Sequence, residues 1–320
     1  MEAPIAVELD AQYRQLREEC GLLDRSARGI FEVRGAEAAE YLQGQLTNDV
    51  EALGPGDGCY AALLDRKGHM QSDMRVLRPA GEEFWIDTEA LAADAVLRHL
   101  ETYKIGREVT ICDRRGEIAL LSLIGPRSIE VAGFAAPPPA ACERVEARGI
   151  GCLAIATEGG LDLACESASS GSLRGSLLEA GAAEVGEEAA EILRIEAGTP
   201  RFGAEMTGAT MPAEAGIVER AVSFTKGCYI GQETVARLHY RGRSNRRLAG
   251  LSLDSAEPSP GAPITLGERE VGVLGSVCVS PALGPIGLAI LRREAEEGDT
   301  VRVGIETGAR VVGLPFRAPE

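Results

Sequence analysis

The segment Lys226-Gly-Cys-Tyr-Ile-Gly-Gln-Glu233 is the most informative stretch of this sequence. Its two glycines let the backbone around Cys228 approach a partner closely, and Lys226 places a positive charge two residues before the thiol. The pattern from Ile230 to Leu238 predicts a helix, so we expect Cys228 to lie near a helix N-terminus. A helix dipole and a nearby ammonium group both favour the thiolate. The segment therefore indicates a reactive cysteine, with a buried structural cysteine as the alternative.

Basic residues follow this segment in a chain that is acidic elsewhere, with a formal net charge of −16 over 320 residues. Guanidinium groups match carboxylates and phosphates with paired hydrogen bonds, so the cluster predicts a site for a small anion. The alternative is that some of these side chains neutralise the protein's own acidic surface. The cluster consists of Arg237, His239, Arg241, Arg243, Arg246 and Arg247.

The net charge also limits the classes of partner. A strongly acidic protein repels nucleic acids and anionic membrane surfaces, so we expect neither as a partner. No apolar run approaches the roughly 20 residues that a membrane-spanning helix needs. The first residues lack the basic and apolar regions of a signal peptide. Together these features predict a cytoplasmic protein.

The eight cysteines are scattered and form no Cys-x-x-Cys pair. This spacing does not match a zinc site or a permanently bound iron–sulfur cluster. With only three histidines, the sequence predicts no metal site. In a reducing compartment most of the thiols are expected to be free.

The pattern of elements predicts an α+β body followed by a small all-β domain. Residues Cys59–Leu64 and Met70–Leu77 alternate like the two strands of a hairpin, and Glu187–Ala197 has the apolar spacing of a helix. The Pro- and Gly-rich stretch Leu253–Pro263 is the strongest signal of a domain boundary. The short alternating runs after it suggest a small all-β barrel or sandwich of about 75 residues. We therefore expect domains at 1–245 and 246–320.

Two carboxylates stand out as candidates for chemistry. Glu196 lies late in a predicted helix, where the dipole disfavours a negative charge, and its two oxygens could accept paired N–H donors from a heterocycle. Asp73 lies on an alternating strand and should face away from Ser72 and Met74, as a general base or a capping carboxylate. An ordinary surface position is the alternative for both.

The segment Lys226–Glu233 resembles the signature of the YgfZ family of folate-binding, iron–sulfur-cluster-related proteins, which are relatives of the glycine-cleavage T-protein, the aminomethyltransferase. The resemblance extends over nearly the whole chain. The other segments that carry it are Cys20–Ser26, Leu42–Asp49, Arg194–Gly203, Met211–Glu214 and Arg237–Arg243.

The resemblance implies a T-protein-like fold, with an α+β folate-binding body around a channel and a C-terminal β-barrel. It implies tetrahydrofolate or a derivative as the cofactor, with the pterin held by Glu196 and the channel lined by the segment through Cys228. Arginine would suit the glutamate end of the folate, which is an inference from charge. The expected folate-binding residues are Glu196, Lys226, Tyr229, Arg237 and Arg241.

The same resemblance implies an accessory role in iron–sulfur cluster assembly or repair, with iron–sulfur enzymes or cluster-assembly proteins as partners and Cys228 as the reactive group. The alternative is a tetrahydrofolate-dependent aminomethyl or methyl transferase with Asp73 as base. The aminomethyltransferases carry an acidic pair where this chain has Ser72-Asp73, so only the second acid is present. The sequence leaves open whether the protein is an enzyme.

Overall fold

The computed structural model describes residues 3–317, with the side chains of residues 8–240 and 242–317. The chain folds into two compact units. The first takes in the chain up to Leu64, Gln71–Ala189 and Arg220–Ile230, and the second takes in Asp65–Met70, Ala190–Glu219 and the chain from Gly231 onwards.

The first unit contains a five-stranded sheet in the order β3-β4-β5-β2-β6. The predicted hairpin is confirmed, because β3 and β4 are adjacent in this sheet and cover the expected residues. The strands are β2 (Gly29–Arg34), β3 (Gly58–Leu64), β4 (Met70–Ala80), β5 (Glu83–Thr88) and β6 (Thr110–Asp113).

A six-stranded sheet in the order β11-β1-β7-β10-β9-β8 forms the second layer of this unit. In this sheet β1 and β11 pair in parallel, and the other described strand pairs are antiparallel. The strands are β1 (Gly21–Asp24), β7 (Ile118–Ile124), β8 (Cys142–Ala147), β9 (Ile150–Thr157), β10 (Gly160–Glu166) and β11 (Ala183–Glu184).

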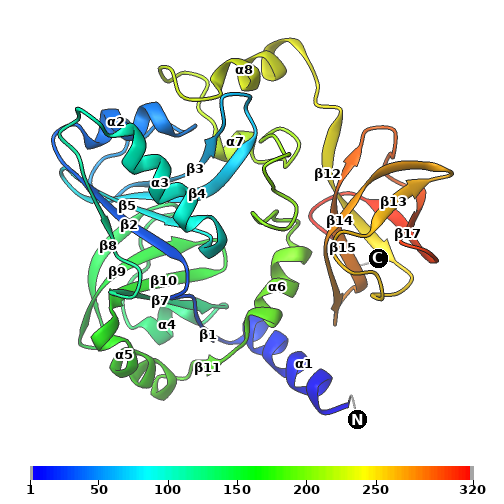
Figure 1. Cartoon of the computed structure of the whole chain (residues 1–320). Coiled ribbons are helices and arrows are strands. Elements are labelled where there is room, and N and C mark those ends of the chain that lie inside the picture. The colour runs from blue at the N-terminus through cyan, green and yellow to red at the C-terminus, as the bar shows by residue number, and fades with distance from the viewer. Residues whose placement is uncertain (1–2, 318–320) are drawn as a thin grey trace. The chain divides into compact units, whose positions relative to one another are not determined.

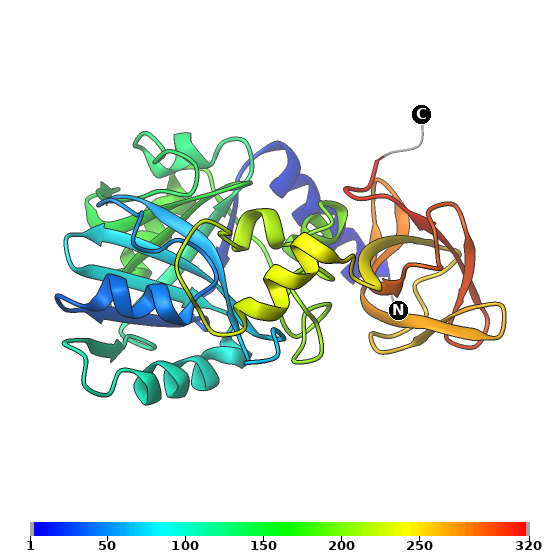
Figure 2. The same cartoon turned by 90° about the horizontal axis from the view of Figure 1, so that it is seen from above.

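The two sheets pack face to face, as the blue-to-cyan and green layers show (Figures 1 and 2). Trp85 and Leu77 of the five-stranded sheet join Leu120 and Leu153 of the other sheet in one buried cluster. Burying apolar side chains between two sheets removes them from water, which is the main stabilising contribution to such a sandwich.

Helices cover the outer faces of both sheets. On the five-stranded side, α3 (Ala93–Tyr103) approaches β2 so closely that a Cβ on Gly29 would lie 2.7 Å from the Cβ of Ala93. On the other side, α4 and α5 contribute to the buried cluster of the six-stranded sheet. The remaining helices of this unit are α1 (Ala3–Glu18), α2 (Ala38–Gln45), η1 (Ala90–Ala92), α4 (Ser128–Ala132) and α5 (Ser167–Glu179).

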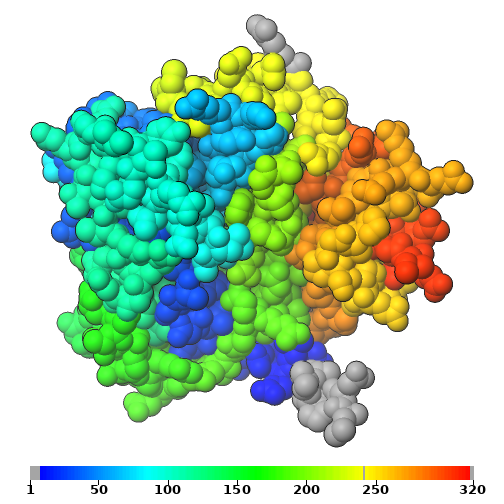
Figure 3. Space-filling view, in the orientation of Figure 1, coloured from blue at the N-terminus to red at the C-terminus, as the bar shows by residue number. Residues whose placement is uncertain are grey.

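The second unit is built around a closed barrel in the order β12-β15-β14-β13-β16-β17, which confirms the predicted C-terminal barrel. The two-residue turn between β13 and β14 projects from it (orange in Figure 3). The strands are β12 (Arg246–Leu253), β13 (Pro263–Leu266), β14 (Arg269–Ser280), β15 (Gly284–Arg292), β16 (Thr300–Val303) and β17 (Thr307–Val312).

The stretch Leu253–Pro263 joins β12 to β13, and both strands belong to the same barrel. The prediction that this stretch separates two domains is therefore wrong. Proline and glycine mark a turn equally well within a domain as between domains. The helix predicted at Glu187–Ala197 is confirmed as α6 (Glu187–Glu196). The division at residue 245 stays a prediction.

The remaining helices are α7 (Val218–Ala221) and α8 (Gln232–Arg241). The helix after Cys228 starts later than expected, because Gly231 occupies the N-cap with φ +85°. Glycine adopts this left-handed conformation without strain, so the turn ends at Gly231 and helical geometry begins after it. Cys228 thus lies three residues before the N-cap of α8, and whether the helix favours its thiolate stays a prediction.

Lys226 fixes the Cys228 segment to the turn that follows α2. Its Nζ donates hydrogen bonds to the backbone carbonyls of Gln43 (2.5 Å), Leu46 (2.6 Å) and Asn48 (2.9 Å). An ammonium group has three N–H donors, so all three are used and none remains for a ligand. Burial lowers the pKa of Lys226 to about 8.

Side chains from the same turn reinforce this connection. Thr47 Oγ1 donates to the carbonyl of Ala221 at 2.6 Å, and Asn48 Nδ2 donates to the carbonyl of Arg220 at 2.9 Å. The segment Leu42–Asp49 and the segment Lys226–Glu233, which both carry the family resemblance, are thus joined to each other through backbone carbonyls.

We predict that Lys226→Met destabilises the ligand-free protein by roughly 2–4 kcal/mol, because three carbonyls lose their donor. Urea unfolding followed by tryptophan fluorescence and circular dichroism measures the change. The matched control is Lys67→Met, since Lys67 is exposed in the β3–β4 turn. Equal stability of the two variants would show that Lys226 has no role in the framework.

Candidate functional site

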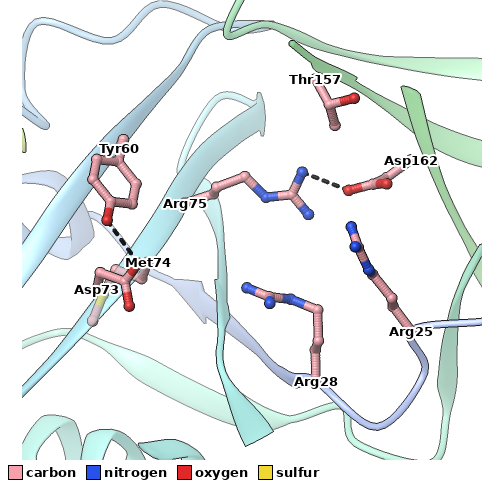
Figure 4. A pocket seen from close by; sticks show the side chains of 8 residues that line it. All are labelled: Arg25, Arg28, Tyr60, Asp73, Met74, Arg75, Thr157 and Asp162. Carbon is pink, nitrogen blue, oxygen red and sulfur yellow. Dashed lines mark hydrogen bonds and ion pairs between the residues drawn. The ribbon is translucent and has the colours of Figure 1, made fainter. Parts of the chain in front are cut away.

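A cavity of about 210 Å³ lies in the first unit, between β3 and β4 of one sheet and β9 and β10 of the other (Figure 4). Charged and hydroxyl-bearing side chains dominate its wall, which is unusual between two sheets and points to a ligand. The lining residues are Arg25, Arg28, Tyr60, Asp73, Met74, Arg75, Thr157 and Asp162.

Strand alternation on β4 places Asp73 in the cavity wall. Ser72 is buried on the opposite face, where its hydroxyl lies 2.6 Å from Thr88 Oγ1. Asp73 and Arg75, two residues apart, therefore share the cavity side of the strand. The predicted orientation of Asp73 away from Ser72 is confirmed, whereas Met74, which was expected to face away from Asp73, also lines the cavity.

Asp73 is oriented by Tyr60, whose hydroxyl donates to Oδ2 of the carboxyl group at 2.7 Å (Figure 4). Oδ1 is buried and has no hydrogen-bond partner among the residues that the structure describes. A buried carboxyl oxygen without a donor costs free energy unless the group is protonated or a ligand supplies the donor.

The surroundings of Asp73 favour its neutral form. Burial raises the pKa of Asp73 above its ordinary value, and the hydrogen bond from Tyr60 and the charge of Arg28 only partly oppose this effect. Burial also raises the pKa of Tyr60, with the charge of Asp73 acting in the same direction, so the phenol stays a donor. The pair is thus a carboxyl group poised to exchange a proton beside a fixed hydroxyl.

Arg28 and Arg75 are held in the wall by one carboxylate. Asp87 of β5 accepts from Arg28 Nε at 2.6 Å through Oδ1, and from Arg75 Nε at 2.7 Å through Oδ2. Arg75 continues to Asp162 of β10 at 2.6 Å, which connects the two sheets (Figure 4). Arg28 also donates to Glu89 at 2.6 Å.

Arg25 is held more loosely than the other two arginines. It follows β1, and its only ion pair among the described residues joins Nε to Glu187 at 3.5 Å. Its side chain is 29% exposed, and the terminal nitrogens extend toward the space beside Arg75 and Asp162 (Figure 4). These nitrogens remain available to an incoming ligand.

The predicted residues around Cys228 also belong to the first unit but do not line this cavity. The Cys228 thiol is exposed. Tyr229 is buried with its ring 5.1 Å from the Lys226 ammonium, and burial raises the pKa of its phenol to about 12. Its hydroxyl has no hydrogen-bond partner in the described part of the chain, which leaves it available to a ligand.

The remaining predicted residues belong to the second unit. Glu196 is buried at the end of α6, where Oε1 accepts a 2.5 Å hydrogen bond from Ser280 Oγ. Arg237 is exposed on α8, and the side chain of Arg241 lies outside the described residues. These three residues thus belong to one unit and the cavity residues to the other.

Part of the arginine cluster serves the protein itself. Arg246 forms an ion pair with Glu214 at 2.9 Å, and Arg247 donates to the carbonyl of Ala295 at 3.0 Å. This matches the alternative in which some of these arginines neutralise the protein's own acidic groups.

Sequence reasoning missed most of the cavity wall. Arg75 could have been found, because it lies two residues from Asp73 on an alternating strand. Arg25 and Arg28 lie in the turn between β1 and β2, and Asp162 lies on a distant strand. Nothing in their local sequence indicates that the sandwich brings them together.

Two absences hold for the described part of the chain. No group of three or more His, Cys, Asp or Glu side chains could hold a metal ion. Within residues 3–317, no helix combines the length and apolar character needed to cross a membrane.

Comparison with known proteins agrees with this architecture. Residues 3–226 match the model of the GCVT N-terminal domain, and residues 246–317 match that of the glycine cleavage T-protein C-terminal barrel domain. A crystal structure of the glycine cleavage system aminomethyltransferase T from Bartonella henselae superposes with a TM-score of 0.87. At 24% identity it covers 97% of this chain and 89% of the other, and shows a shared T-protein-like fold.

Curated relatives extend the match over nearly the full length. An aminomethyltransferase from Rubrobacter xylanophilus is 33% identical, covering 96% of this chain and 86% of the relative. One from Symbiobacterium thermophilum is 31% identical, covering 96% and 89%. The two family models and these relatives show that the chain belongs to the glycine-cleavage T-protein (aminomethyltransferase) family.

Proposed function

We propose that the protein binds tetrahydrofolate and transfers a one-carbon unit, with Asp73 as the group that moves the proton. The observation that carries this proposal is the Tyr60-bound carboxyl group of Asp73 in the wall of a charged cavity. The curated relatives support it, since both are named aminomethyltransferase and their matches cover 96% of this chain. This is the transferase alternative of the sequence analysis.

The chemistry of such a transfer suits the state of Asp73. When an aminomethyl group passes its carbon to tetrahydrofolate, the departing amine must gain a proton. A carboxyl group with a raised pKa can supply that proton more readily near neutral pH than an ordinary aspartate. Tyr60 fixes the orientation of the carboxyl group, which the transfer requires.

As candidate folate contacts we propose Tyr229 in the first unit and, as a separate proposal, Glu196, Arg237 and Arg241 in the second unit. Glu196 is supported by its burial, and Tyr229 by its unpartnered phenol. Arg237 is supported by its exposed positive charge in an acidic protein. Lys226 acts through the framework that holds Tyr229 in place.

We predict that Asp73→Asn leaves the melting temperature at pH 7 equal to or above that of the parent. The raised pKa means that the native state binds more protons than the unfolded state above the ordinary Asp value of about 3.9, so ionised Asp73 costs stability as pH rises. The difference between variant and parent should vanish as pH falls below that value.

Differential scanning fluorimetry from pH 3 to 8 measures this effect. Asp10→Asn is the matched control, because Asp10 is exposed on α1. A lower melting temperature for Asp73→Asn at pH 7 would mean that Asp73 is a paired, ionised carboxylate.

We further predict that Asp73→Asn lowers the rate of methylene-tetrahydrofolate formation from an aminomethylated carrier protein by about 10²- to 10⁴-fold, because proton transfer is lost. Cys228→Ala should retain the rate, since the thiol does not line the cavity. The opposite pattern, with Cys228→Ala inactive and Asp73→Asn active, would exclude the proposed transferase.

A second candidate function is the accessory role in iron–sulfur cluster assembly or repair that the YgfZ-like signature implies. The specific observation in its favour is the exposed Cys228 thiol, on a segment that Lys226 holds with three hydrogen bonds. Ser72 in place of an acid also removes half of the acidic pair of the aminomethyltransferases.

This candidate predicts that Cys228→Ala folds normally but fails to protect iron–sulfur enzymes in cells that lack the wild-type protein. Cys112→Ala is the control, because Cys112 is likewise exposed. Aconitase activity in extracts is the measurement, and full protection by Cys228→Ala would exclude a role for the thiol.

A further inference from the structure

We propose that the cavity of the first unit binds a small amino acid, with its carboxylate at Arg25, Arg28 and Arg75 and its amino group toward Asp73. This rests on the proposed function and deepens it, because it names a second substrate class for the same site. The proposal depends on three features: the convergence of the arginines, the balance of charge, and the acid at the other end.

Three guanidinium groups face one small space. Asp87 accepts hydrogen bonds from both Arg28 and Arg75. Arg25 approaches the same space from the turn after β1 (Figure 4). Asp87 and Asp162 offset the repulsion between Arg28 and Arg75, whereas Arg25 has one long ion pair at 3.5 Å. The terminal nitrogens of Arg25 have no partner among the described residues, and a carboxylate is the group that a guanidinium fork binds with two parallel hydrogen bonds.

The charge balance favours a zwitterion over a simple anion. Four carboxylates contact these three arginines, namely Asp87, Glu89, Asp162 and Glu187. These four carboxylates carry one more charge than the three arginines, so a dianion such as phosphate would add to an excess of negative charge. A ligand with a negative and a positive end adds no net charge.

The opposite wall supplies the partner for an amino group. Asp73 presents a carboxyl group whose Oδ1 lacks a donor in the described part of the chain, and Tyr60 holds the other oxygen. An amino N–H would satisfy Oδ1. The cavity volume of about 210 Å³ suits a small amino acid, since pockets for drug-sized ligands measure about 300–1,000 Å³.

The test is titration calorimetry of the full chain with glycine, N-methylglycine and the two halves of glycine, acetate and methylamine. We expect saturable binding of glycine or N-methylglycine, at least tenfold tighter than either half. Arg25→Gln should weaken binding of the amino acid and of acetate at least tenfold. Asp73→Asn should weaken the amino acid but leave acetate binding unchanged.

Arg144→Gln is the matched control and should bind like the parent, because Arg144 is exposed and pairs only with Glu83 among the described residues. Melting temperatures test whether each variant folds. We expect Arg25→Gln to fold, because the substitution removes one long ion pair, to Glu187 at 3.5 Å. No saturable binding of either amino acid to the parent, or equal binding to Arg25→Gln, overturns the proposal.

Tetrahydrofolate, titrated separately, distinguishes this proposal from the proposed function. Amino acid binding without any folate binding would contradict the folate-dependent function and leave the amino acid site intact. Folate binding that displaces the amino acid competitively would assign the cavity to the folate and overturn the amino acid site.

Discussion

The candidate site depends on the ion pairs that the Asp87 carboxylate forms with two arginines. This carboxylate lies between Arg28 and Arg75, and through Arg75 it connects the five-stranded sheet to Asp162 of the six-stranded sheet. Burial alone would raise the pKa of Asp87, but the two guanidinium groups hold it below its ordinary value. Removing one partner from such a buried network leaves an unpaired charge, which typically costs about 3–5 kcal/mol.

Asp87 and Asp73 lie on neighbouring strands and have opposite electrostatic environments. Asp87 is paired with two arginines and stays ionised, whereas Asp73 is half-buried beside a phenol and has a raised pKa. When the environments of two carboxyl groups shift their pKa values in opposite directions, one group can serve as a fixed charge and the other can exchange protons. The proposed proton transfer therefore suits Asp73 and not Asp87.

Local sequence patterns predicted the elements better than the site. Alternation located the β3–β4 hairpin and the cavity side of β4, and apolar spacing located α6. These are properties of consecutive residues, so a single sequence contains them. Arg28 and Asp162 meet only because two sheets pack face to face, and no local signal records that packing.

The motif around Cys228 shows a different limit. The sequence indicated a functional cation at Lys226, but the structure shows three hydrogen bonds to backbone carbonyls. Charge alone does not distinguish a ligand contact from a framework contact. The position of the helix start likewise depended on one glycine, Gly231, whose positive φ moves the start from the predicted Ile230 to Gln232.

The central claim is that the cavity at Asp73 is where the one-carbon chemistry takes place. A crystal structure grown with tetrahydrofolate and glycine tests it most directly. We expect electron density within hydrogen-bonding distance of the Asp73 carboxyl group, in the space bounded by Tyr60 and Arg25. Folate bound elsewhere, with only water between these side chains, would contradict the claim.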